Sequence, residues 1–311
     1  MIGLEDIAVY VPERYISNLE LLKKFDISES FLTEKIGVLK RAIKHSGEDT
    51  SDMALKALKR LISKAGIDKE ELQCLIVVTQ NPDSNLPHVS GIVHGKAELP
   101  SSCAVFDISL GCSGYVYGLS ILLSFLKANQ LCRGVLITCD PYSKVIDVDD
   151  KNTALLFGDA STATLIGPSP VMICSHFMFG TQGDLSGALT CQNGKLKMKG
   201  REVFNFAARV IPESIKQLCQ RANICKEEVD CFIFHQGSRY LIETLIKRIG
   251  LEEAKVLFDI EQVGNTVSSS IPLLLEKKML DSADNIFVLS GFGVGLSWAN
   301  CLCRRTERNN D

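Results

Sequence analysis

The sequence predicts an α/β protein made of two similar halves, and two observations support this prediction. Buried strand-like runs alternate with amphipathic helices along the whole chain, a pattern typical of α/β folds. Two short sequence patterns also recur roughly 150 residues apart and in the same order, which indicates a duplicated unit. A chain of 311 residues is long enough for two ordinary domains or one large α/β unit.

Continuous apolar runs predict strands that are covered on both faces of a sheet. They lie at residues 75–78, 104–108, 135–138, 232–234, 256–258 and 286–289. One amphipathic helix is predicted over about residues 51–65, where Leu58 and Leu61 share an apolar stripe and Ser51 is a candidate N-cap. A second helix is predicted over about residues 238–249.

The recurring patterns lie at predicted strand–helix junctions. Residues 67–80 read IDKEELQCLIVVTQ, and residues 224–237 read ICKEEVDCFIFHQG. The triplet FDI precedes Gly111-Cys112 and appears again before Gly264-Asn265. A duplication would give halves at 1–168 and 169–311, related by a pseudo-twofold axis that brings Cys112 and Asn265 together. Chance similarity between helix–strand junctions is the alternative that the sequence leaves open.

Composition and charge narrow the class of protein. Hydrophobic residues make up 46% of the chain, which predicts a sizeable core. The net charge is −3 and the pI is about 6.0, so a general nucleic-acid or membrane-surface binder is not expected. The start, MIGLEDIAVYVPERY, lacks the features of a signal peptide, and no apolar run is long enough to span a bilayer. We therefore expect a soluble, cytoplasmic protein.

The 12 cysteines are irregularly spaced and form no C-x-x-C pair. Several lie in apolar strand-like runs, as expected for reduced, buried side chains in a reducing compartment. The five scattered histidines indicate no zinc site. We therefore predict no metal.

Cys112 is the candidate nucleophile. It follows a predicted buried strand and a turn at Gly111, and it precedes a long apolar helix. Unpaired N–H groups and the helix dipole at that position favour a thiolate, so we expect the pKa of Cys112 to be lowered. An inert core cysteine is the alternative.

His235 and Asn265 are candidate partners of this cysteine. His235 ends a predicted buried strand, where α/β sheets place ligands, and Asn265 follows Gly264 at the second copy of the repeated junction. Alone, each has a simpler explanation, as a core histidine or as a turn residue. A later glycine-rich segment, LSGFGVGLSWA, could supply a backbone amide that pairs with the Cys112 amide as an oxyanion hole.

Together these segments resemble the β-ketoacyl-acyl-carrier-protein synthase III family. The segments that carry the resemblance cover nearly the whole chain in the family's order: DISLGCSGYVYGL, LLFGDASTATLIG, LKMKGREVFNFA, FHQGS, GNTVSSSIP and GFGVGLSWA. The resemblance implies a thiolase-like fold with two duplicated halves in a five-layer αβαβα arrangement, and a homodimer.

The resemblance also implies the chemistry. Cys112 would take an acyl group from an acyl-coenzyme A, with the amides of Cys112 and Val294 as the oxyanion hole. A malonyl thioester on acyl carrier protein would then lose carbon dioxide while His235 and Asn265 donate hydrogen bonds to its carbonyl. Coenzyme A is a substrate here, and no permanently bound cofactor is implied.

The binding residues are also implied by the resemblance. The coenzyme A tunnel would be lined by Phe31, Lys35, Lys151, Arg201 and Phe204. The acyl pocket would include Phe157, and Leu86 would cap the partner subunit's pocket. The acidic carrier protein would dock on Arg239, Lys247 and Arg248.

The chain departs from the family pattern after His235, where Gly237 and Ser238 replace the usual alanine and asparagine. The pathway therefore stays open between initiation of fatty-acid synthesis and a specialised acyl or polyketide route. The alternative activity is a non-decarboxylating acyltransferase that moves the Cys112 acyl group to an oxygen, nitrogen or sulfur nucleophile, with His235 as base. A non-catalytic acyl-binding partner and a papain-like hydrolase are further alternatives.

Overall fold

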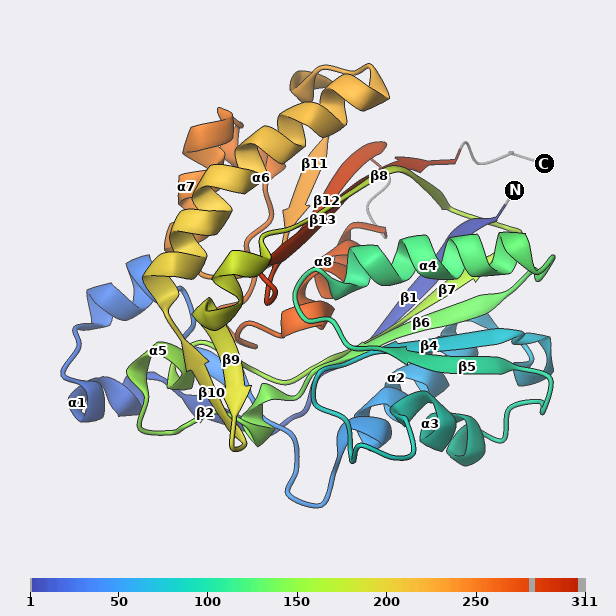
Figure 1. Ribbon diagram of the computed structural model, residues 1–311, viewed down its shortest axis with the longest axis horizontal. Coiled ribbons are helices and arrows are strands. Elements are labelled where there is room, and N and C mark those ends of the chain that lie inside the picture. Colours follow the sequence, from blue (N-terminus) through green and yellow to red (C-terminus); the bar gives the residue numbers. More distant parts are fainter. Residues whose placement is uncertain (1, 280–282, 307–311) are drawn as a thin grey trace.

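The computed structural model describes residues 2–279 and 283–306, and its centre is a mixed β-sheet (Figure 1). Within the described residues the sheet has nine strands, in the order β11-β12-β13-β8-β1-β7-β6-β4-β5. Their bounds are β1 (Gly3–Tyr10), β4 (Cys74–Val78), β5 (Ala104–Ile108), β6 (Gly134–Cys139), β7 (Ser161–Gly167), β8 (Met172–Thr181), β11 (Cys231–Phe234), β12 (Ile286–Gly293) and β13 (Ser297–Arg305). Two small two-stranded sheets pair β2 (Tyr15–Ser17) with β3 (Lys40–Ala42) and β9 (Leu189–Gln192) with β10 (Lys195–Met198).

The helices connect and cover these strands. They are α1 (Leu22–Phe25), α2 (Thr50–Ala65), α3 (Val89–Ala97), α4 (Gly114–Ala128), α5 (Lys151–Ala154), α6 (Gly200–Ala222), α7 (Arg239–Ile249) and α8 (Ser270–Met279). A π-helical turn, η2 (Phe31–Ile36), and a 3-10 turn, η8 (Val267–Ser269), lie near the site described below. In the part of the chain that is described, no helix combines the length and hydrophobicity needed to cross a membrane.

The two ends of the sheet repeat one strand pattern. On one side β4 lies parallel between β5 and β6, and antiparallel β7 and β1 follow. On the other side β11 lies parallel between β12 and a bridge at Val256, and antiparallel β13 and β8 follow. The sides meet where Leu4 pairs with Met172. The predicted α/β class with two similar halves is confirmed, while the boundary between residues 168 and 169 stays a prediction.

Five layers follow from how the helices pack. Helices α4 and α8 lie between the two parts of the sheet, α2 and α3 cover one outer face, and α6 and α7 cover the other (Figure 1). Strand β4 shows why its sequence is continuously apolar: Ile76 packs into the inner core, while Leu75 and Val77 pack into the core under α2 and α3. Burying each such side chain stabilises the fold by about 1.5–3 kcal/mol.

The structure corrects two details of the predicted elements. Helix α2 begins at Thr50 and is capped by Asp49, whose carboxylate and that of Asp52 form a capping box. The Ser51 hydroxyl instead donates to Asp83 Oδ2 at 2.6 Å. Residues 256–258 form a single bridge rather than a strand, because the Gln236 side chain donates to the carbonyl of Leu257 at 3.1 Å.

Candidate active site

Cys112 lies in the turn between β5 and α4, and its side chain is 5% exposed. Ser113 occupies the N-cap position of α4, and its hydroxyl is 2.9 Å from the Ser297 hydroxyl at the start of β13. A Cβ atom at Gly111 would lie 2.5 Å from Gln80 Oε1, so a larger residue there would displace the Gln80 side chain. The predicted placement of Cys112 beside a helix start is confirmed.

The glycine-rich end of β12 packs directly against this turn. A Cβ at Gly293 would lie 2.8 Å from Cys112 Sγ, and a Cβ at Gly291 would lie 2.6 Å from the Cys112 carbonyl oxygen. Because both positions lack side chains, the β12 backbone can reach the sulfur. The backbone N–H groups of Cys112 and Val294 both lie in hydrogen-bonding positions toward Sγ.

The predicted lowering of the Cys112 pKa is wrong. Burial raises the pKa of Cys112, the nearby Asp140 carboxylate raises it further, and the N–H groups of Cys112 and Val294 only partly offset this. Helix α4 begins at Gly114, so Cys112 lies before the N-cap rather than in the first turn. Cys112 is therefore a thiol at rest, and its ionisation must accompany attack on a substrate.

His235 directly follows β11 and is 3% exposed. Its backbone N–H donates to the Ser290 carbonyl at 2.8 Å, and its ring meets Phe292 edge-on with the ring centroids 5.6 Å apart. Nδ1 lies 2.8 Å from the Ser270 hydroxyl. Burial lowers the pKa of His235 to about 3, so the imidazole is neutral near pH 7.

Asn265 is fixed through its backbone and its side chain. Its N–H donates to the Leu156 carbonyl at 2.9 Å, and its own carbonyl accepts from Gly158 N–H at 3.0 Å. Its Oδ1 accepts from Val267 N–H at 2.9 Å, which leaves Nδ2 directed to His235 Nε2 at 3.4 Å. Val267 holds this position with φ of +55°, a strained value for a β-branched residue.

A cavity of about 250 Å³ brings Cys112, His235 and Asn265 together. Cys112 comes from the first half of the chain, and the other two come from the second. Toward solvent the cavity is lined by Phe31, Lys35, Lys151, Phe204 and Tyr240. The pseudo-twofold arrangement predicted from the repeat thus places the two junctions on one cavity.

The mouth of this cavity is aromatic and basic. Lys35 Nζ lies 4.2 Å from the centroid of the Tyr240 ring, which stacks on Phe204 at 5.3 Å. Lys151 Nζ lies 5.9 Å from the Phe31 ring centroid. Sequence reasoning missed Tyr240 as a lining residue, although an aromatic residue two positions after the N-cap Ser238 was visible.

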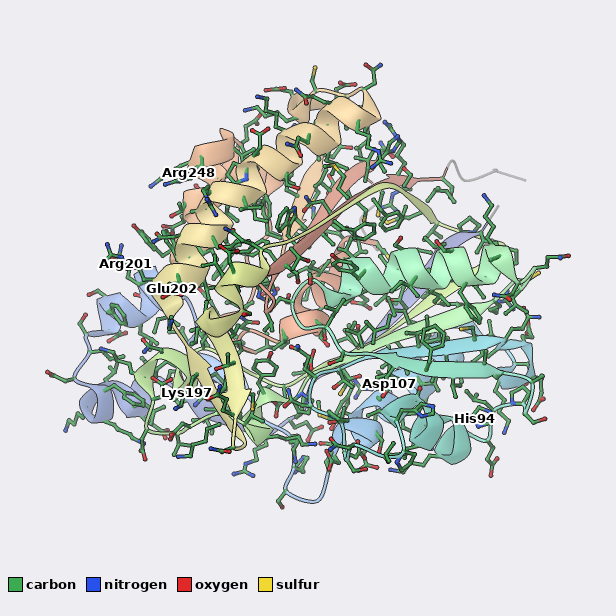
Figure 2. All side chains as sticks on the ribbon, in the orientation of Figure 1. His94, Asp107, Lys197, Arg201, Glu202 and Arg248 are labelled. Atoms are coloured by element: carbon green, nitrogen blue, oxygen red, sulfur yellow. The ribbon has the colours of Figure 1, made fainter. Side chains whose placement is uncertain are left out.

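Arg201 is not among the residues that line the cavity. Figure 2 shows it at the N-terminal end of α6, on the same side of the view as Arg248 on α7 and Lys197 on β10. Its predicted contact with coenzyme A stays a prediction. Lys247 and Arg248 are exposed near the end of α7, whereas Arg239 pairs with Glu261 at 2.5 Å.

A second cavity of about 170 Å³ lies near the first one. It shares Leu189 with the first cavity and includes Val294, Gln80 and Tyr142. The Tyr142 hydroxyl donates to Gln80 Oε1 at 3.1 Å. Sequence reasoning missed both polar residues, since nothing local marks them as cavity residues.

The two predicted acyl-pocket residues differ in their surroundings. Phe157 is 2% exposed, lines the first cavity, and has its ring 4.9 Å from that of Tyr142. Leu86 is 86% exposed and lines neither of these two cavities. Their assignment to the acyl pocket stays a prediction.

Asp140 is a buried carboxylate beside the site that sequence reasoning missed. Its Oδ1 accepts from Gln80 N–H at 2.6 Å, and its Oδ2 accepts from the Ser268 hydroxyl at 2.7 Å. Burial raises the pKa of Asp140 to about 6. It joins the Gln80 loop to the segment after Asn265.

Among the described residues, no three His, Cys, Asp or Glu side chains form a group that could hold a metal ion.

The chain is similar over most of its length to known proteins. Two family profiles match, 3-oxoacyl-[acyl-carrier-protein] synthase III over residues 106–183 and its C-terminal domain over residues 219–305. β-Ketoacyl-[acyl-carrier-protein] synthase III of Lactococcus lactis subsp. cremoris is 32% identical, with 95% of this chain and 96% of the relative covered. The Geobacillus kaustophilus protein of the same name is 33% identical, with 95% and 96% covered.

Solved structures agree with this fold. The 3-oxoacyl-[acyl-carrier-protein] synthase III of Aquifex aeolicus superposes with a TM-score of 0.91 at 29% identity, covering 98% of this chain and all of the relative. The priming β-ketosynthase from the R1128 polyketide pathway gives 0.89 at 25% identity, covering 98% and 96%. With its thiolase-like layers and a Cys, His and Asn on one cavity, the chain belongs to the 3-oxoacyl-[acyl-carrier-protein] synthase III family.

Proposed function

We propose that this protein is a decarboxylating condensing enzyme that joins an acyl group from an acyl-coenzyme A to a malonyl unit on acyl carrier protein. One observation carries the proposal. The Cys112 thiol, which faces two backbone N–H groups, lines the same cavity as two neutral side chains, His235 and Asn265. Relatives more than 30% identical over nearly the full chain carry the name of this activity.

In the first half-reaction, Cys112 Sγ attacks the thioester carbon of the acyl-coenzyme A. The carbon–sulfur bond to coenzyme A breaks, and the Cys112 proton leaves on the coenzyme A thiol. The N–H groups of Cys112 and Val294 stabilise the tetrahedral oxyanion, and such a donor is worth about 2.7–4 kcal/mol. The same N–H groups assist ionisation of the buried thiol as it attacks.

In the second half-reaction, the malonyl carboxylate leaves as carbon dioxide, and its bonding electrons form an enolate at the thioester. Two neutral donors, Asn265 Nδ2–H and His235 Nε2–H, stabilise the enolate oxygen. The enolate carbon then attacks the Cys112 thioester, and the Cys112 thiolate leaves and regains a proton. A β-ketoacyl thioester on the carrier protein is the product.

The aromatic and basic mouth of the cavity suits coenzyme A. The Phe31 ring offers a face to the adenine, and Lys35 and Lys151 offer charge to phosphates. Lysine is a point charge and cannot make the bidentate contacts of arginine. We propose that Phe204, stacked on Tyr240, forms the opposite wall and that Arg201 contributes charge beyond it.

For the carrier protein we propose docking on α7. Lys247 and Arg248 are exposed near the end of that helix, which suits an acidic partner, and Arg248 Nη1 also donates to the Ala208 carbonyl at 3.0 Å. Arg239 lies in an ion pair with Glu261 and contacts the Phe258 ring, so its role would be to shape the surface. The twelve free thiols would stay reduced in the cytoplasm, where we place the protein.

We further propose a homodimer built on strand β5. This strand is the last in the described sheet, and all five of its residues are only partly buried. An unpaired apolar edge strand invites pairing with a second chain. Dimerisation would also give the exposed Leu86 a partner surface, as expected for a residue that caps the other subunit's acyl pocket.

Intact-mass measurement tests the proposed function. The protein is incubated with a panel of acyl-coenzyme A thioesters, and the mass added to Cys112 is recorded. Malonyl-loaded carrier protein is then added, and carbon dioxide release is measured. Acylation followed by carbon dioxide release is expected. Acylation without it would favour the non-decarboxylating acyltransferase, and a lack of acylation would overturn the proposal.

A further inference from the structure

The Ser270 hydroxyl lies between two groups, and it has only one proton to donate. Its oxygen is 2.8 Å from His235 Nδ1 and 3.0 Å from the Val267 carbonyl oxygen. Ser270 is 2% exposed and His235 is 3% exposed, so water does not compete for these bonds. The direction of this one O–H bond therefore decides which nitrogen of a neutral His235 carries the proton.

If the hydroxyl donates to the Val267 carbonyl, the Ser270 oxygen must accept a hydrogen bond from His235 Nδ1–H. Nε2 then faces the cavity as a bare acceptor, and its partner is Asn265 Nδ2–H at 3.4 Å. That separation is longer than the usual 2.7–3.2 Å of a hydrogen bond from N–H. The bond that would favour this tautomer is therefore weak.

If the hydroxyl donates to His235 Nδ1, the proton stays on Nε2 and faces the cavity. The Val267 carbonyl keeps a partner in this arrangement, because the backbone N–H of Ser270 also donates to it. The ring Nδ1, the Ser270 hydroxyl and the Val267 carbonyl are then all bonded, while Nε2–H and Asn265 Nδ2–H are two donors that need an acceptor in the cavity. The Nε2–H and Asn265 Nδ2–H groups then lie side by side, and one carbonyl oxygen between them would satisfy both.

The backbone N–H of Val267 could also favour the Nε2-protonated tautomer by donating to His235 Nδ1, but it has another partner. Its buried N–H is taken by Asn265 Oδ1 at 2.9 Å, so this N–H aims Nδ2 at the cavity rather than donating to His235. The Val267 backbone also bonds to the imidazole as an acceptor and partly opposes the effect of burial on the pKa of His235. The Ser270 hydroxyl is the neighbour of Nδ1 that has a proton to give.

We propose that Ser270 is a positioning residue that donates to His235 Nδ1 and so holds the imidazole as an Nε2–H donor toward the malonyl thioester. This inference rests on the proposed function, because it assigns one hydroxyl to the second half-reaction alone. Acylation of Cys112 uses the N–H groups of Cys112 and Val294 and does not depend on the tautomer.

The test compares three variants of the full-length protein. Ser270→Ala removes the donor, Ser270→Cys keeps a weaker one of similar size, and Ser269→Ala deletes an equally buried neighbouring hydroxyl that bonds Thr138 and Ala160 instead. Acylation by acetyl-coenzyme A and carbon dioxide release from malonyl-loaded carrier protein are measured separately.

We expect Ser270→Ala to lower carbon dioxide release by about 100-fold, in line with loss of an oxyanion donor, while the acylation rate changes little. Ser270→Cys should fall between Ser270→Ala and the unchanged protein, and Ser269→Ala should retain the ratio of the two rates. Equal loss of both half-reactions in Ser270→Ala, or no loss of either, would overturn the inference.

Ring ¹⁵N chemical shifts provide a readout that does not need turnover. The His235 signals are identified by their absence in His235→Gln. We expect the Nε2-protonated pattern in the unmodified protein and a shift toward Nδ1 protonation in Ser270→Ala. An Nδ1-protonated pattern already present in the unmodified protein would refute the inference. If the unmodified protein shows the Nε2-protonated pattern but catalyses neither half-reaction, the proposed function is wrong, while the effect of Ser270 on the tautomer is still supported.

Discussion

The two repeated strand–helix junctions of this protein, at Cys112 and at Asn265, occupy equivalent positions in the two halves but differ in their surroundings. At the first, a strand leads through one turn into the 15-residue helix α4, and the N–H groups of Cys112 and Val294 face the Cys112 sulfur. At the second, Asn265 is bonded through its backbone on both sides and through Oδ1. The comparison shows how one duplicated frame supplies both a reactive atom and a rigid donor.

The neighbours of the two junctions explain this difference. The Cys112 turn is flanked by glycines of β12, which leave room beside the sulfur. The Asn265 turn is followed by the strained Val267 and by Ser270, whose bonds fix Asn265 and His235 in turn. A nucleophile needs space for an incoming acyl group, whereas a hydrogen-bond donor needs a fixed direction.

The largest expected effect comes from removing the reactive atom. Cys112→Ala should abolish acylation, because no other thiol lines the first cavity among the described residues. Intact mass after incubation with an acyl-coenzyme A checks this. Retained acylation on another residue would show that the first junction is not the acyl-accepting site.

Removing the Asn265 side chain, the rigid hydrogen-bond donor, should affect only the second half-reaction. We expect Asn265→Ala to lower condensation by roughly 10²–10³-fold while acylation of Cys112 continues. The two rates are measured as mass gained and as carbon dioxide released. If condensation proceeds normally, the division of labour between the junctions is wrong.

A side chain that fills the space beside Cys112 should lower activity nearly as much as the loss of Asn265. In Gly293→Ala the new Cβ would lie 2.8 Å from Cys112 Sγ, so sulfur or strand must move. We expect acylation to fall by about 100-fold, the cost of a small misplacement at a reacting centre. Gly187→Ala is the matched control, because nothing lies within 4 Å of its new Cβ. Equal rates in both variants would contradict the close packing.

The buried, neutral His235 should make the free energy of unfolding depend on pH. The pKa of His235 in the folded protein is lowered to about 3, from 6.5 for an ordinary histidine. Between these values the unfolded chain binds a proton that the folded protein does not, so the free energy of unfolding falls as pH drops from 6.5 toward 3.

Urea unfolding at pH 7 and pH 5 measures this effect. His235→Gln should lose less stability over that interval than the unmodified protein does. Asp140 acts in the opposite direction in both proteins, because its pKa is raised to about 6 and the folded state binds the proton more tightly. Comparing the two proteins removes that contribution, and identical pH dependence would show that His235 is not buried in neutral form.

The smallest expected effect concerns the second cavity. Tyr142→Phe removes the hydroxyl that donates to Gln80 Oε1 and makes this cavity more apolar. We expect a few-fold shift in acylation rate toward longer saturated acyl groups, consistent with the 1–3 kcal/mol that one methylene is worth. A panel of acyl-coenzyme A thioesters measures it. An unchanged preference would place the acyl chain elsewhere.

Much of the fold could be predicted because buried strands leave a local record. The runs at 75–78 and 232–234 are apolar throughout because both faces of each strand are covered, and each lies within a strand of the sheet. The run at 256–258 has the same composition and forms only a bridge, since the Gln236 side chain bonds there. Local sequence could not reveal that competing contact.

The sequence by itself determined the α/β class, the repeat and the identity of Cys112, His235 and Asn265 as candidates, because residue type and order carry that information. Only the tertiary structure decided the charge state of the thiol, the contacts of Asp140, Tyr142 and Ser270, and the convergence on one cavity. Burial and hydrogen-bond partners set the pKa of a thiol and the tautomer of an imidazole. Those partners come from segments far apart in the chain.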